Sequence, residues 1–127
     1  MNEFVIDDLN SLSKAAGYMH DAGFGRESIE YDKTNGILKV TAKKYQYIGK
    51  IFQRKTNVVE GEFNLVLSHV KTLDIIERDK KGYQATGEDY FNDIKMKSDK
   101  ILVIRTAFHE IKLEVEDFLG TFEYSPR

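Results

Sequence analysis

The sequence predicts an α+β domain in which one N-terminal amphipathic helix packs on a twisted, mostly antiparallel sheet of five or six strands. Three observations lead to this prediction. Apolar residues recur at helical spacing over residues 5–20, the period changes to two after Gly25, and the connections between strands are short. Short connections favour a meander, and a strong twist can curl such a sheet into a half-barrel. Residues 1–127 fit a single domain, without an internal repeat or a linker.

The helix is predicted from a stripe of apolar side chains spaced three and four residues apart. The stripe consists of Val5, Leu9, Leu12, Ala16 and Met19. Asp7 and Asp8 fall in the first turn, where carboxylates can cap a helix and interact favourably with its dipole. A helix with such a stripe is expected to cover one face of the sheet.

The dipeptide Asn35-Gly36 predicts a β-hairpin over residues 28–42, because both positions of a tight two-residue turn need positive φ. A turn placed there sets Tyr31 opposite Val40. The same register puts apolar pairs on one face and an opposite-charge pair on the other, which is the pattern of a half-buried hairpin.

The remaining strands are predicted from alternation and from breaks at glycine. The second hairpin strand continues to about Tyr47 and the chain returns through Phe52. Residues 62–77 form a long strand whose pattern slips near residues 73–76, which indicates a bulge or bend. A loop over residues 78–89 and a short strand over 90–97 follow. Residues 100–118 are expected to form one long strand or two collinear strands.

Composition excludes several classes of function. The net charge of −2 lacks the basic surplus of a typical nucleic-acid binder. The absence of cysteine excludes disulfides and thiol catalysis. The first residues are acidic and polar, and the longest aliphatic run covers only residues 101–104. We therefore expect no signal peptide, no membrane span and a cytoplasmic protein.

Three histidines are the candidate metal ligands. His69 and His109 share the parity of neighbouring core residues, and His20 lies near the end of the predicted helix. If they converge between helix and sheet, they can form a zinc or iron site, with Asp21 or Glu110 as a carboxylate ligand. The alternative is that each is a lone histidine at the edge of the core, hydrogen-bonded locally. No motif predicts a cofactor.

The stretch AFHEIKLEVEDF, residues 107–118, also contains closely spaced carboxylates. Glu110, Glu114 and Glu116 share a parity with Lys112, so a strand puts all four on one face. Catalytic carboxylates should instead converge across a cleft. We interpret this stripe as a solvated face of the sheet.

Two segments are candidates for recognition. Residues 43–55 carry five basic residues, no acid and three interleaved aromatics, a pattern that can bind single-stranded nucleic acid or protect a sheet edge. The loop over residues 78–89 fails as a phosphate loop, because Glu88 and Asp89 stand where lysine and a hydroxyl are needed. It also fails as a calcium loop, because Lys81 stands where an oxygen ligand is needed.

These patterns favour binding over catalysis. Residues 1–30 carry a local charge of −4 and residues 31–60 one of +5, so two oppositely charged faces are available to a partner. We expect a small non-catalytic protein-binding domain, such as an adaptor or an inhibitor of a toxin, with a homodimer as a further option. The alternative is a small-ligand or metal-binding protein that uses the histidines. The predicted partner-contacting residues are Lys43, Lys44, Lys50, Arg54, Tyr83, Glu88 and Asp89.

Overall fold

The computed structural model describes residues 2–20, 22–45, 59–77 and 89–126 of the chain. Within these ranges the chain forms one α-helix, one short 3₁₀ helix and eight β-strands. In chain order the elements are β1 (Asn2–Ile6), α1 (Leu9–Met19), β2 (Gly23–Phe24), η1 (Arg26–Ser28), β3 (Ile29–Asp32), β4 (Ile37–Tyr45), β5 (Val59–Glu77), β6 (Asp89–Ser98), β7 (Ile101–Thr106) and β8 (His109–Pro126).

All eight strands belong to one antiparallel sheet, which confirms the predicted α+β class. The strand order is β2-β6-β7-β8-β5-β4-β3, and β1 pairs with β8 farther along that strand. The predicted count of five or six strands and the single meander are corrected. Two meanders, β3-β4-β5 and β6-β7-β8, are joined through the pairing of β5 with β8.

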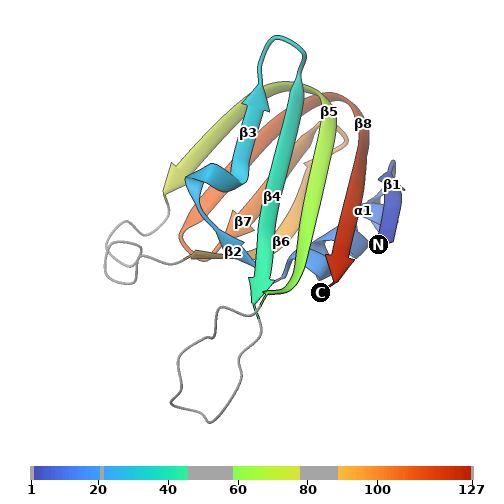
Figure 1. The fold of residues 1–127 in the computed structure, drawn as a ribbon. Helices are drawn as coiled ribbons and strands as arrows, with labels where there is room; N and C mark the ends of the chain where they lie inside the picture. The colour runs from blue at the N-terminus through green and yellow to red at the C-terminus, as the bar shows by residue number, and fades with distance from the viewer. Residues whose placement is uncertain (1, 21, 46–58, 78–88, 127) are drawn as a thin grey trace.

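The sheet is strongly curved and remains open. In Figure 1, β4, β5 and β8 lie in front, and β6 and β7 lie behind them. The two ends of the sheet approach each other, because a Cβ on Gly23 of β2 would lie 3.8 Å from the carbonyl oxygen of Lys43 on β4. The core fills the concave side, where α1 buries Leu12, Ala15 and Met19. No helix in the described ranges has the length and apolar character needed to cross a membrane.

The first residues of the predicted helix form β1 instead. Phe4 and Ile6 face Phe122 and Gly120 across the β1–β8 ladder, and Ile6 is fully buried. Pairing with β8 therefore outweighs the helical spacing of the apolar residues. As a result, two members of the predicted stripe, at positions 5 and 9, are 54% and 58% exposed.

The helix begins at Asp8, as the predicted cap requires. The carboxylate of Asp8 accepts the backbone N–H of Ser11 at 2.7 Å, and the Ser11 hydroxyl accepts the backbone N–H of Asp8 at 3.2 Å. This reciprocal pair is a capping box. The hydrogen bonds from the Ser11 backbone and side chain lower the pKa of Asp8 below its usual value.

Replacing Asp8 with alanine is expected to lower the midpoint of urea unfolding at pH 7, because the first turn of α1 loses its acceptor. The pKa of Asp8 falls on folding, so its contribution is present above the unfolded value and is lost as pH falls through the folded value. The difference between wild type and Asp8→Ala should therefore shrink below about pH 4. Asp8→Asn keeps a good cap without this titration and is the control. Equal midpoints for wild type and Asp8→Ala at pH 7 would contradict the prediction.

The predicted hairpin is present, with its register shifted by two residues. Tyr31 faces Leu38, and Asp32 faces Ile37, so a four-residue loop replaces the two-residue turn. The Asp32 carboxylate accepts the backbone N–H of Asn35 at 3.2 Å and its side-chain amide at 2.7 Å. Of the four loop residues, only Gly36 takes positive φ, at 66°. Since the shift is two residues, each side chain stays on its predicted face.

The stretch predicted as one strand or two collinear strands is a hairpin of β7 and β8. Arg105 faces Glu110, so the chain reverses at residues 107–108 without a glycine or a proline. The hydroxyl of Thr106 accepts the backbone N–H of His109 at 2.8 Å. This side-chain hydrogen bond closes the turn. The turn was not predicted, because it contains neither of the residues, glycine and proline, that usually indicate one.

An aromatic cluster holds β1 and α1 to the sheet. The ring of Phe122 lies 5.2 Å from Phe4, 5.6 Å from Tyr18 and 5.9 Å from Phe63, measured between centroids. Phe63 and Phe122 are fully buried. The cluster therefore joins β1, α1, β5 and β8 at one end of the concave face.

Candidate functional site

The three histidines considered as metal ligands lie in three different environments. His20 is exposed at the end of α1, with its Nδ1 3.0 Å from the carbonyl oxygen of Asn92. His69 is exposed in a bulge of β5 and has a φ of 58°. His109 begins β8 and is buried, facing inward with Ile111 as its parity predicts.

These three histidines, predicted as candidate metal ligands, do not converge in the structure. His109 faces Glu77 across the β5–β8 ladder, and Glu77 is eight residues from His69 along β5. At about 3.3 Å per residue, roughly 25 Å separates the two positions. Register shifts lie on both sides of Val70, and at the first of them His69 is opposite three residues of β8, 116–118. His69 is exposed there instead of facing the core. The described ranges contain no group of three His, Cys, Asp or Glu side chains that could hold a metal ion.

Asp89, the first residue of β6, holds His109 in place. Oδ2 of Asp89 lies 2.6 Å from Nδ1 of His109 and accepts the hydroxyl of Thr106, also at 2.6 Å. Oδ1 accepts the backbone N–H groups of Tyr90 and Phe108 at 2.8 and 3.1 Å. Each oxygen of this buried carboxylate therefore has two donors, which offsets the cost of removing its charge from water.

The far side of the His109 ring points toward the end of β5. Its Nε2 lies 3.7 Å from Oε1 of Glu77, and its ring packs against Phe24 at a centroid distance of 5.4 Å. A carboxylate that orients an imidazole is found in catalytic triads and around metals. Here the side chain of His109 is 2% exposed, and its described neighbour at Nε2 is a carboxylate rather than a nucleophile. The arrangement supports a structural role that ties β6, β7 and β8 together.

The predicted partner-contacting residues lie in different environments, and four of them fall outside the described residues. Lys43 is exposed on β4, opposite Glu62 of β5. The backbone of Lys44 belongs to β4, whereas its side chain lies outside the described part of the structure. Asp89 is buried in β6 and bonded to His109, whereas the sequence placed it in a loop. Outside the described residues lie Lys50, Arg54, Tyr83 and Glu88.

The glutamate stripe of β8 lies on the outer face of the sheet, as predicted. Glu114 and Glu116 are exposed, and Lys112, two residues before Glu114, faces Asp74 of β5. Nζ of Lys71 lies 4.0 Å from Oε1 of Glu116. Exposed pairs of this kind contribute little to stability, so the stripe is a solvated surface rather than a catalytic pair.

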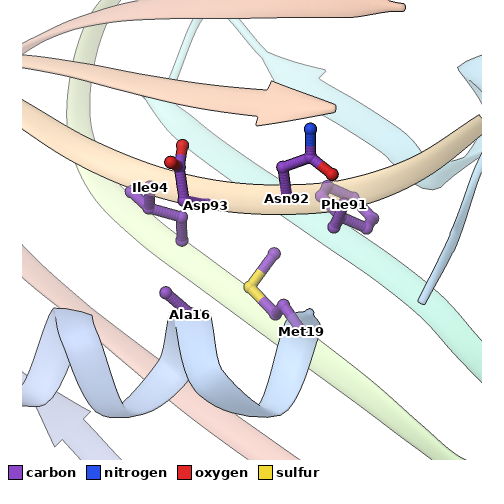
Figure 2. Close-up of a pocket in the computed structure, with 6 residues that line it drawn as sticks. All are labelled: Ala16, Met19, Phe91, Asn92, Asp93 and Ile94. Carbon is purple, nitrogen blue, oxygen red and sulfur yellow. The ribbon is translucent and has the colours of Figure 1, made fainter. Parts of the chain in front are cut away.

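A small pocket lies between α1 and β6, as Figure 2 shows. Its empty space is about 140 Å³, part of it open to solvent, and it is lined by Ala16, Met19, Phe91, Asn92, Asp93 and Ile94. The polar groups of Asn92 and Asp93 point away from the helix in Figure 2, and Asp93 is bonded to Arg105 on β7. Ligand pockets usually enclose about 300–1,000 Å³. This pocket therefore does not support the small-ligand alternative.

Exposed apolar side chains gather around β1 instead. Four large hydrophobic residues are at least 44% exposed in the described part of the chain: Val5, Leu9, Ile76 and Leu119. Val5 of β1 faces Thr121 of β8, so Leu119 is its diagonal neighbour on the same outer face. Leu9 begins α1, shortly after β1 ends. Three of the four residues thus belong to one end of the molecule.

Sequence reasoning did not single out this surface. It assigned Val5 and Leu9 to the buried stripe of a helix, whereas both are exposed. Comparison with family models, with curated proteins and with solved structures finds no match to this chain.

Proposed function

We propose that this chain is a non-catalytic protein-binding domain that contacts its partner through β1 and the adjoining part of β8. The observation that carries the proposal is the exposure of Val5, Leu9 and Leu119 around β1. Single exposed apolar residues are normal on any protein, but a group of them at one place is typical of an interaction surface.

The position of β1 in the sheet supports the same proposal. Among the described strands, β1 pairs only with β8, so its other side is an edge (Figure 1). An edge strand presents unpaired backbone N–H and C=O groups that a partner strand can pair with. Many peptide-binding domains use this mode, in which backbone bonds supply affinity and alternate side chains supply specificity.

Photo-crosslinking in cells of the source organism tests the proposed surface. A crosslinking amino acid in place of Val5 or Leu119 should capture one distinct protein. The control position is Ile76, which is 47% exposed near the far end of β5 and should capture that protein at least several-fold less. The reason is that only positions 5 and 119 lie on the proposed contact surface.

Two results would contradict the proposal. The first is equal capture at positions 5 and 76, and the second is no captured protein at position 5 or 119 while the chain is folded. Capture of a second copy of the chain would support binding at β1 and would identify the partner as the chain itself.

A further inference from the structure

On the outer face of the sheet, the side chains of paired residues form rows across neighbouring strands, and two of these rows end at β1. One row passes from Asn64 of β5 through Glu123 of β8 to Glu3 of β1. The next row passes through Thr121 to Val5. Among the described strands each row ends at β1, so an added strand would place its own side chains beside Glu3 and Val5.

The Glu3 row contains two like charges directly opposite each other. Glu3 and Glu123 are partners in the β1–β8 ladder, an arrangement that is destabilising on a sheet face. The other edge of the sheet differs, because Glu30 of β3 faces Lys39 of β4. A basic side chain placed beside Glu3 would relieve the repulsion at β1, whereas the β3 edge already pairs opposite charges.

The charge pattern continues beyond Val5. Asp7 is exposed and occupies the next alternate position, immediately after β1 ends. Glu3 and Val5 of β1 and Asp7, the first residue after the strand, therefore alternate as acidic, apolar and acidic along the chain. A complementary strand would carry a basic, an apolar and a basic residue with the same spacing.

We infer that β1 binds an extended basic segment of another protein as an added strand, with an apolar residue against Val5 and basic residues beside Glu3 and Asp7. This inference rests on the proposed function and specifies the chemistry of the partner. Backbone bonds to β1 would fix the segment, and the two acids would set its preference for positive charge. Because these charges are exposed, binding should weaken as salt is raised.

Short synthetic peptides with capped ends test the inference on the purified full chain. The probe contains the core Lys-Thr-Val-Thr-Lys, whose threonines favour an extended backbone. One control replaces both lysines with glutamate, and the other replaces valine with serine. NMR titration should show that the probe binds most tightly of the three and shifts backbone amides of residues 2–7 and 119–124. Raising the salt from about 0.05 to about 0.5 M should weaken its binding.

Charge reversal on the protein provides the matched comparison. Glu3→Lys should weaken binding of the probe by roughly tenfold, because one attraction is lost and one repulsion is gained. Glu30→Lys makes the same change of net charge on the opposite edge strand and should leave binding within about twofold of wild type. Glu3→Lys should also restore binding of the glutamate-containing peptide.

The outcomes separate the partner chemistry from the function. Equal binding of the lysine and glutamate peptides, shifts confined to other strands, or equal effects of Glu3→Lys and Glu30→Lys would each overturn the basic-segment inference. If crosslinking still captures a partner at Val5, the proposed protein-binding function stands even though the basic-segment inference fails. A chain that dimerises through β1 and excludes the probe would also overturn the inference, because a second copy would then be the occupant.

Discussion

Replacing Asp89 with alanine is expected to destabilise the protein by about 3 kcal/mol or more, because each buried donor left without an acceptor costs about 1–3 kcal/mol. The substitution leaves the His109 ring, the Thr106 hydroxyl and two backbone N–H groups without their acceptor. The Thr106 hydroxyl and the His109 ring cannot turn to water, since both residues are at most 1% exposed. Urea unfolding at pH 7 measures the loss. A decrease below about 1 kcal/mol, the range of an exposed pair, would contradict a structural role for the network.

Two further variants keep this prediction testable if Asp89→Ala does not fold. Asp89→Asn retains an acceptor for the backbone N–H groups and should lose less stability than alanine. The double variant Asp89→Ala with His109→Ala should lose less than the sum of the two single losses, because the partners act on each other. Additive losses would show that the 2.6 Å contact between Asp89 and His109 contributes no coupling.

Side-chain periodicity predicted the elements that depend on local pattern. Alternation in β8 predicted that His109, Ile111 and Leu113 face inward, and all three are buried. The hairpin of β3 and β4 was predicted with the correct faces, although its register was shifted by two residues. A two-residue turn and a four-residue loop preserve the same parity, and the Asp32 carboxylate decided between them.

Long-range pairing was not predictable from these patterns. Val5 and Leu9 fit the apolar stripe of a helix by spacing, whereas pairing with β8 makes residues 2–6 a strand. The two bulges around Val70 likewise depend on how β5 bends against β8, so the parity of His69 gave the wrong face. Local sequence carries no signal of which distant strand will be the neighbour.

The buried hydrogen bonds among Asp89, Thr106 and His109 could be predicted only in part. Thr106 and His109 are three residues apart and close their own turn, which the sequence could have indicated. Asp89 is 17 and 20 residues from its two side-chain partners, and its acidic neighbours suggested an exposed loop. Since Asp89 shares the inward parity of Phe91, alternation extended by one step would have placed it in β6.

Strand β8 links the buried parts of the molecule to the proposed contact surface. His109 lies at its first position, and Phe122 lies near its other end, where β1 pairs with residues 120–124. The side of β8 opposite β5 is shared by β7 and β1 at different heights along the strand. The edge that we propose as the contact surface is therefore attached through β8 and the aromatic cluster around Phe122.

Replacing Phe122 with alanine is expected to cost about 3–5 kcal/mol and to release β1. The fully buried ring contacts both Phe4 and Tyr18, so its removal leaves a cavity directly beneath β1. Hydrogen exchange should show that the amides of residues 2–6 lose more protection than those of β5. Binding of the basic peptide should decrease in parallel, since a strand that is not ordered cannot accept another strand.

Phe91→Ala is the matched control for this effect. Phe91 is 1% exposed on β6 and packs against Phe24 and Phe63, away from β1. It should cost a similar free energy of unfolding while β1 keeps its relative protection. Phe122→Leu, which fills most of the volume, should retain both stability and peptide binding better than alanine. If Phe122→Ala and Phe91→Ala changed β1 protection equally, β1 would be held by the fold as a whole and not by the ring of Phe122.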